Sequence, residues 1–306
     1  MATDLVRALV RGRPVRDISS ATGLRRHLSS VESVEDTVER AALAGRAADG
    51  PAWAFAAGYE GALAKLDPAA TRGGSLVAFC ATEEGGGHPR SIRSSLSERP
   101  GGGFALTGSK TFVTLGADAD MLLVVASTGE REGRNVLRVA RVPSRREGVT
   151  LRPAPPMPFA SEVGHARATF EAVPVEEADL LAGDGYDDAL KPFRTIEDVH
   201  VLAALLGWAI GVALESVWAR AWIEEAVALT LLLRTLGRAP PLSAETHVAL
   251  GGALTAAHRL LHAGAWSTAP GRVHDAWERD RALLTVASTV RAARLASAWG
   301  ALVGAQ

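Results

Sequence analysis

The stretch "AFCATEEGGGHPRSIRSSLSERPGGGFALTGSKTFVTLGADADMLLVVAST", residues 78–128, decides the fold that the sequence predicts. Short apolar segments alternate in it with Gly, Pro and Asp, a pattern typical of short β-strands joined by turns. Three glycines, Gly85 to Gly87, follow directly on the first apolar segment. Glycine costs backbone entropy on folding, but it allows positive φ and a close approach of the main chain to a ligand. The glycine run therefore suggests a place where backbone meets a ligand.

The amino-acid composition changes on both sides of this stretch. Residues 21–66 are rich in Ala, Leu and charged residues at helical spacing, with a break near Gly50 and Pro51. The C-terminal part has the same composition. We expect helices there near 189–233, 243–264 and 275–303, the first two separated by "RTLGRAPPLS". Between these helical regions the sequence predicts seven short strands, at residues 75–81, 91–98, 103–115, 120–128, 135–142, 148–154 and 165–173.

Helices, then strands, then helices predict an α+β fold and disfavour an alternating βαβ arrangement. We expect three domains: a short N-terminal helical domain at 1–74, a middle β-barrel or sandwich domain at 75–183, and a C-terminal helical bundle at 184–306. The glycine run precedes another strand-like segment, so it lacks the strand-glycine-helix context of a dinucleotide fingerprint.

Composition excludes several classes of function. The net charge is -1 and the pI about 6.7, which argues against nucleic acid and anionic membrane surfaces as partners. The single cysteine, Cys80, rules out an internal disulfide framework. The most apolar run, 201–214, is too short to span a bilayer and predicts a buried helix, and the N-terminus does not resemble a secretory signal. We expect a cytoplasmic protein.

Several stretches resemble the acyl-CoA dehydrogenase family. Residues 78–128 resemble the start of its middle β domain, and "ATFEAVPVEEADLLAG", 168–183, resembles the segment that closes this domain. Residues 196–221 are similar to its first long C-terminal helix, and 233–266 to the R-x-x-F-G-x-P segment with the second long helix. The resemblance, which covers residues 50–304, implies an acyl-CoA dehydrogenase-like fold with FAD as cofactor. It also implies removal of hydrogens from Cα and Cβ of an acyl thioester carried by CoA or a carrier protein.

The resemblance also assigns residues to the flavin. Thr82 matches a threonine that hydrogen-bonds the flavin pyrimidine edge, Phe112 an aromatic residue against the ring, and Thr114 a hydroxyl near N5 or O4. Gly87 belongs to the glycine turn along the flavin, and Arg234 matches an arginine that contacts the FAD pyrophosphate of a neighbouring subunit. Each also has a structural interpretation: strand residues for the threonines, core for Phe112, and a cationic helix end for Arg234.

Glu197 is the candidate catalytic base. It matches the glutamate at the start of the long helix that acts as base in some family members, although acidic residues also open many helices because they suit the positive N-terminus. His200 shares its helix face and either tunes this base beside the substrate or is a satisfied core residue. Glu197 and His200 form an E-x-x-H pair, but the helical region has no second copy, so we expect no metal site.

The chain departs from the family pattern on the substrate side. His88 and Pro89 stand where the family has Ser and Asp; His88 and Arg90 remain substrate-side candidates. The sequence ends near the family's Gly-Gly turn, so we expect a short, C-terminally truncated, divergent member, either a homo-oligomer or a hetero-oligomer with a longer homologue. Besides dehydrogenation, the sequence leaves open a non-catalytic or half-site subunit, and a flavin monooxygenase or redox-neutral enzyme on this fold.

Overall fold

The computed structural model describes residues 2–12 and 15–304. Contacts between residues divide the chain into two compact units. Unit 1 contains the described residues up to Lys65, the segment Met157–Glu162, and the chain from Arg194 onward. Unit 2 contains Leu66–Pro156 and Val163–Phe193. The three domains expected from composition remain a prediction, since this division by contacts places the N-terminal and C-terminal helices in one unit.

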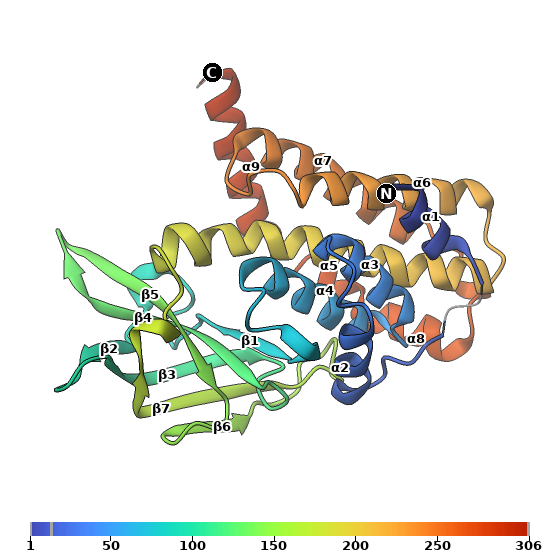
Figure 1. Ribbon diagram of the computed structural model, residues 1–306. Helices are drawn as coiled ribbons and strands as arrows, with labels where there is room; N and C mark the ends of the chain where they lie inside the picture. Colours follow the sequence, from blue (N-terminus) through green and yellow to red (C-terminus); the bar gives the residue numbers. More distant parts are fainter. Residues whose placement is uncertain (1, 13–14, 305–306) are drawn as a thin grey trace. The chain divides into compact units, whose positions relative to one another are not determined.

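Unit 1 is helical (Figure 1). Its helices are α1 (Ala2–Val10), α2 (Ala21–Ser30), α3 (Thr37–Ala47), α4 (Pro51–Leu66), α5 (Lys191–Glu215), α6 (Arg220–Leu236), α7 (Ala244–His262), α8 (Gly271–Asp280) and α9 (Ser288–Val303). The predicted breaks near Gly50 and at "RTLGRAPPLS" are confirmed. Asp36 begins α3 by accepting hydrogen bonds from the backbone N–H groups of Val38 and Glu39, both at 3.1 Å, as an N-cap aspartate does.

Unit 2 is a single curled sheet of seven strands in mixed orientation. The strands are β1 (Val77–Cys80), β2 (Ser95–Glu98), β3 (Phe104–Thr114), β4 (Met121–Arg131), β5 (Arg134–Pro143), β6 (Val149–Pro153) and β7 (His165–Val175). All seven predicted strands are present, although the second begins only at Ser95. The order is β1-β4-β2-β3-β7-β6, with β5 on β4, and the inward faces pack a core that includes Leu106, Val124 and Phe170. The predicted α+β class is confirmed.

The helix expected over 189–233 is wrong as a single element, because the chain breaks between α5 and α6. Val217 lies there with φ of 55°, in the left-handed region that a β-branched residue rarely adopts. The turn brings Trp218 into a cluster of aromatic rings, with its centroid 4.8 Å from those of both Trp222 and Trp266. Burial of these large rings offsets the backbone strain, and no local sequence signal marks this compensation.

The long apolar helix α5 is part of the protein interior. Together with the preceding π-helical turn, Gly185–Leu190, it has the length and composition of a membrane-crossing helix. The run 201–214, which was predicted to be a buried helix, is the C-terminal part of this longer element. However, 83% of its apolar window is buried inside the structure, which is the behaviour of a core helix.

Two glycines allow α3 and α5 to cross at close range. A Cβ atom on Gly45 of α3 would overlap the carbonyl oxygen of Ala204, and one on Gly207 of α5 would overlap the carbonyl oxygen of Ala42. In both cases the obstacle is helix backbone, which cannot rotate away as a side chain can. The crossing therefore depends on the absence of side chains at these two positions.

We expect Gly45→Ala and Gly207→Ala each to lower the free energy of unfolding by about 1–3 kcal/mol, because the added methyl group forces the two helices apart. Urea unfolding followed by circular dichroism measures this change. Gly252→Ala is the matched control: Gly252 lies inside α7 with nothing within 4 Å of an added Cβ. There alanine should stabilise by up to about 1 kcal/mol through its higher helix propensity. Equal effects at all three positions would contradict the close crossing.

Candidate functional site

The glycine run forms a tight turn beside β1. Glu83 and Gly86 form an isolated bridge, with the Glu83 N–H donating to Gly86 O at 3.1 Å and the Gly86 N–H donating to Glu83 O at 2.8 Å. Gly86 has φ of 97°, a conformation that favours glycine. Gly86 thus uses the positive φ that glycine allows, whereas the predicted contact of the glycine run with a ligand remains a prediction.

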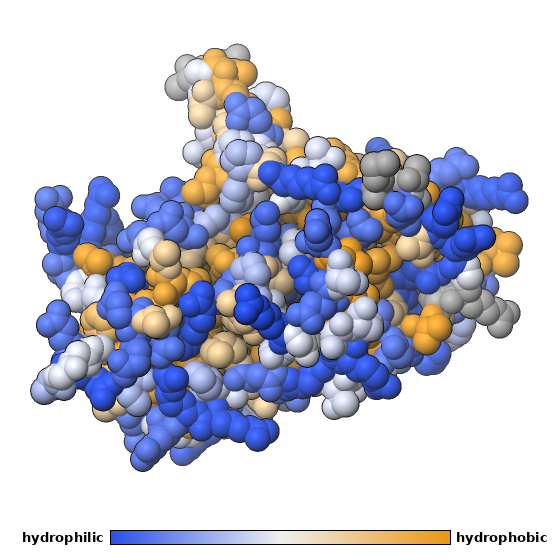
Figure 2. Space-filling view, in the orientation of Figure 1, coloured by the Kyte–Doolittle hydropathy of each residue, from blue (hydrophilic) through white to orange (hydrophobic). Residues whose placement is uncertain are grey.

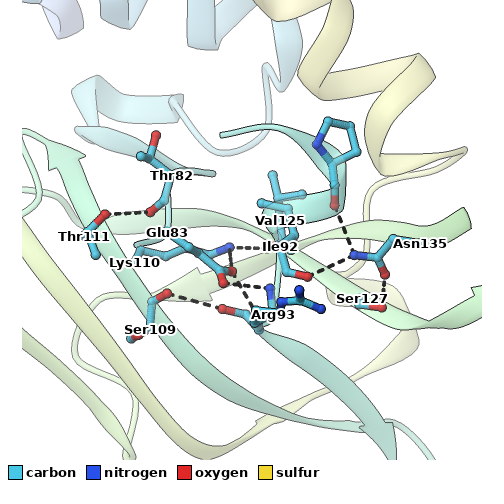
Figure 3. Close-up of polar contacts among 12 residues, drawn as sticks. Thr82, Glu83, Ile92, Arg93, Ser109, Lys110, Thr111, Val125, Ser127 and Asn135 are labelled. Atoms are coloured by element: carbon cyan, nitrogen blue, oxygen red, sulfur yellow. Dashed lines mark hydrogen bonds and ion pairs between the residues drawn. The ribbon is translucent and has the colours of Figure 1, made fainter. Parts of the chain in front are cut away.

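A buried ion pair holds the base of this turn (Figure 3). Lys110 of β3 is fully buried, and its Nζ donates to Glu83 Oε1 at 2.7 Å and to the carbonyl of Val125 at 2.6 Å. The same Glu83 carboxylate accepts from the backbone N–H groups of Arg93, at 2.7 Å, and Ser94, at 3.0 Å. One carboxylate thus joins the beginning of the turn, its exit and a neighbouring strand.

The directions of the pKa shifts indicate that Glu83 and Lys110 form an ionised pair. Burial by itself raises the pKa of Glu83, but the hydrogen bond and charge of Lys110 and the two backbone donors outweigh it and leave the pKa below its ordinary value. Burial lowers the pKa of Lys110, although Glu83 opposes this shift. Sequence reasoning missed both residues as a pair, because they are 27 positions apart and each looks like an ordinary strand-end residue.

The far end of the turn is fixed from β5. The Asn135 side-chain amide donates to the carbonyls of Pro89, at 3.2 Å, and Ile92, at 2.9 Å (Figure 3). His88 caps the short 3-10 turn Pro89–Ser91 by accepting from the Arg90 N–H through Nδ1 at 3.2 Å. His88 and Arg90 are exposed, so they remain available as the predicted substrate-side groups.

Three predicted flavin residues lie close together in the backbone of unit 2. Thr82 and Phe112 pair in an isolated antiparallel bridge, and Thr114 follows two residues later on β3. Phe112 is 39% exposed, which is unusual for a large aromatic residue in a sheet. The structure adds His165 to this group, since it pairs with Thr114 in the register of β3 and β7, and its ring lies 4.2 Å from that of Phe112.

Glu197 occupies the first half of α5 in unit 1 and is partly buried. Burial raises the pKa of Glu197 to about 7, the neighbouring negative charge of Asp198 adds to this rise, and Arg291 and Arg194 oppose it. A carboxyl group with such a pKa is available both as an acid and as a base near neutral pH. Burial on the apolar helix α5 is thus the main cause of the raised pKa of Glu197.

His200 and Arg234 have structural partners. His200 is fully buried; its Nε2 lies 2.8 Å from Thr37 Oγ1, its Nδ1 lies 2.7 Å from the carbonyl of Ile196, and burial lowers its pKa to about 4. Both ring nitrogens are occupied, which favours the core-residue interpretation over a substrate contact. Arg234 forms ion pairs with Asp36 and Glu39 of α3, which likewise favours a structural role.

No group of three or more metal-ligating side chains occurs within residues 2–12 and 15–304. What the described residues do offer is an exposed aromatic ring with hydroxyl groups beside it in unit 2, and a carboxyl group of raised pKa in unit 1. The chain that carries them combines a helical unit with a curled mixed sheet.

Comparison with known proteins identifies the middle domain and the fold. Residues 78–173 match the family model of the acyl-CoA dehydrogenase middle domain. Residues 78–173 therefore form an acyl-CoA dehydrogenase middle domain, and the chain as a whole has the acyl-CoA dehydrogenase fold, as the sequence predicted. A search of the curated proteins finds no match.

Solved structures of three proteins are similar over almost the whole chain. FMN-bound TdsC from Paenibacillus sp. A11-2 is 19% identical with a TM-score of 0.71, and the match covers 99% of this chain and 96% of that one. Butyryl-CoA dehydrogenase from Megasphaera elsdenii is 16% identical with a TM-score of 0.66, covering 98% and 89%. Glutaryl-CoA dehydrogenase from Mycobacterium smegmatis is 16% identical with a TM-score of 0.66, covering 99% and 94%. At these identities the likeness establishes the fold.

Proposed function

We propose that the protein is a flavin-dependent oxidoreductase that removes hydrogens from Cα and Cβ of an acyl thioester, with Glu197 as the base. The observation that carries this proposal is the raised pKa of Glu197, about 7, on the long helix α5. A glutamate with an ordinary pKa near 4.3 is a weak base toward a carbon acid. A pKa near 7 combines greater basicity with a substantial ionised fraction at neutral pH.

The residues of unit 2 fit a flavin. Phe112 presents an exposed ring face, and Thr82 and Thr114 provide hydroxyl groups on the adjoining backbone, which suits a planar ring system with a polar edge. Bound there, a flavin would supply the acceptor for the hydrogen that leaves Cβ with its electron pair. Gly87 and the turn held by the Glu83–Lys110 pair would form the neighbouring backbone. We propose FAD as this flavin from the family resemblance.

In the proposed reaction, the step that the protein's own side chains perform is abstraction of the Cα proton. The Cα proton passes to the ionised carboxylate of Glu197, and the electron pair left on Cα forms the new double bond as the Cβ hydrogen departs. Burial around Glu197 favours its neutral form after proton transfer. Exposed His88 and Arg90 are proposed as contacts for the thioester arm, where a guanidinium group suits a phosphate of CoA.

The first experiment is spectroscopic. Purified protein should be yellow, cofactor released by heat should elute as FAD, and a series of acyl-CoA substrates added without oxygen should bleach the band near 450 nm. Colourless protein after reconstitution with FAD and with FMN would overturn the flavin assignment. Yellow protein that no acyl thioester bleaches would overturn the dehydrogenase assignment while leaving a flavoprotein.

A flavin monooxygenase is the second candidate. One solved structure of TdsC is described as dibenzothiophene monooxygenase, and this chain is at least as similar to TdsC, with a TM-score of 0.68 in that structure, as to butyryl-CoA dehydrogenase, at 0.66. Protein that incorporates labelled oxygen from O₂ into an organic substrate when supplied with reduced flavin would favour this reaction over thioester dehydrogenation.

We also propose that the protein forms oligomers. Apolar side chains of α9 are exposed, among them Trp299 at 47%, Leu302 at 43% and Val303 at 59%, and Figure 2 shows hydrophobic atoms over this end of the helix. Such clusters on a protein surface are usually interfaces. Light scattering after gel filtration, alone and with a longer homologue coexpressed, separates a homo-oligomer from a mixed assembly with a half-site subunit. A monomer in both experiments would contradict the proposal.

A further inference from the structure

A pocket lies between α7 and α9, within unit 1. It has a volume of about 220 Å³. Its apolar wall consists of Leu250 and Leu254 of α7, Leu284, and Leu295 of α9. Its polar lining includes His247, His258, Arg291 and Arg294. Figure 1 shows α9 lying against α7, so two packed helices form the pocket. An apolar wall with a few cationic groups is the composition of a binding site for a small amphipathic ligand.

The two arginines share a single carboxylate. Arg291 donates to Asp198 Oδ1 through Nε at 2.9 Å and through Nη2 at 2.7 Å, and Arg294 Nη2 donates to the other oxygen of Asp198. The side chains are only 18% and 17% exposed for the arginines and 7% for the aspartate. Two positive charges and one negative charge are therefore largely removed from water. A charge that is removed from water raises the free energy of the folded state unless an opposite charge and hydrogen bonds compensate it.

Nearby groups do not remove this surplus of positive charge. Glu197 is a further carboxyl that interacts with Arg291, and the rise of its pKa to about 7 keeps part of it neutral at neutral pH. Burial lowers the pKa of His247 and of His258, so at neutral pH both rings act as hydrogen-bonding groups without charge. His258 Nε2 is buried and has no hydrogen-bond partner among the residues that the structure describes. The pocket therefore combines excess positive charge with an unsatisfied polar atom.

We propose that this pocket binds a small aliphatic monocarboxylate, with its carboxylate toward Arg291, Arg294 and His258 and its chain against the leucines. A carboxylate matches the forked donors of arginine, and a charge-assisted bond to a buried guanidinium is among the stronger hydrogen bonds. At roughly 30 Å³ for each water-sized group, the volume suits about seven non-hydrogen atoms. This site is additional to the proposed oxidoreductase function and does not depend on a flavin.

Titration calorimetry of the full chain with sodium hexanoate, hexan-1-ol and hexylamine tests the head group. We expect hexanoate to bind at least about tenfold more tightly than hexanol, and hexylamine not to bind, because a single charge-assisted hydrogen bond exceeds this difference in free energy. Hexyl phosphate completes the series. Hexanol binding as tightly as hexanoate, or hexyl phosphate binding more tightly, would overturn the monocarboxylate assignment.

A pair of matched variants tests the location. Ser288 and Ser297 are both exposed on α9, but only Ser288 lines the pocket. Ser288→Trp should fill the pocket from its rim and weaken hexanoate binding at least about tenfold, whereas Ser297→Trp should bind as the wild type does. Circular dichroism confirms that both variants fold. Equal hexanoate affinity in the two variants would place the bound carboxylate elsewhere and overturn the proposal.

Discussion

Replacing Glu197 with glutamine is expected to slow the anaerobic bleaching of bound flavin by an acyl thioester about 10²- to 10⁴-fold, the usual contribution of a general base. Glutamine keeps the size and hydrogen-bonding shape of the side chain but cannot accept the proton. The variant should retain its flavin and its yellow colour, since none of the proposed flavin contacts involves Glu197. Stopped-flow absorbance near 450 nm measures the rate.

The pH dependence of the same rate provides an independent check. Glu197 acts as a base only when ionised, and its pKa is raised to about 7. The bleaching rate of the wild type should therefore increase as the pH rises through about 7 and level off above it. In Glu197→Gln the remaining rate should lack this step. A titration step that survives in the variant belongs to another group.

Glu224→Gln is the matched control. Glu224 is exposed on α6, so its replacement removes a carboxylate from the helical unit without altering a buried group. This variant should bleach at the wild-type rate with an unchanged pH profile. If Glu197→Gln also reacts at the wild-type rate, Glu197 is not the base, and the dehydrogenation mechanism proposed above fails even if the protein binds flavin.

Replacing Lys110 with methionine is expected to lower the free energy of unfolding by about 3–5 kcal/mol, the usual cost of leaving one member of a buried ion pair without its partner. Methionine fills most of the volume of the lysine stem, so lost packing contributes little. The variant leaves the Glu83 carboxylate buried with two backbone donors but no cation. Urea unfolding of the full chain, followed by circular dichroism, measures the change.

The pH dependence of this loss has a defined sign. In the wild type the pKa of Glu83 is below its ordinary value, so the ionised carboxylate stabilises the fold above the unfolded pKa, and this stability is lost as the pH falls. Without Lys110 the desolvated carboxyl group favours its neutral form. The difference between wild type and Lys110→Met should therefore be smallest in acid and grow toward neutral pH.

Two further variants isolate the pair. Adding Glu83→Gln to Lys110→Met should restore part of the stability, because the unpaired charge is gone. Lys191→Met is the surface control, since Lys191 is 48% exposed and its ion pair with Asp187 is of the weak i,i+4 kind, worth about 0.3–0.5 kcal/mol. If Lys110→Met lowers the free energy of unfolding no more than Lys191→Met does, the buried Glu83–Lys110 ion pair contributes nothing to stability.

The strands were predictable from sequence because their signals are local. The strand Met121–Arg131, for example, begins with an apolar run directly after Asp120 and ends before the turn at Gly133, so that turn residues specify its ends. The break at Val217 was not predictable, because its strain is offset by contacts of Trp218 with Trp266, which lies beyond two further helices. Local propensity cannot indicate a conformation that distant packing stabilises.

In the candidate site, too, the residues with a local sequence signal were predictable, whereas pairs of residues far apart in the sequence were not. Thr82, Phe112 and Thr114 could be proposed because a motif fixes their spacing, and in the structure a β-bridge joins Thr82 to Phe112. The Glu83–Lys110 pair and the two arginines on Asp198 were missed, since each joins residues far apart in sequence whose types are ordinary on a surface. For His200 the sequence left two interpretations open, and its partners on α3 and α5 favour the core residue over the substrate contact.

Unit 1 is assembled from both ends of the chain, and this arrangement constrains how the protein is made. The helices before Lys65 share their unit with α5, α6 and α7, so a ribosome must synthesise the entire sheet before those partners emerge. Until then the faces of α3 and α4 that pack against α5 are uncovered, during the interval when nascent chains are most exposed to chaperones and proteases. A polypeptide released before α5 would contain the complete sheet yet lack a folded helical unit.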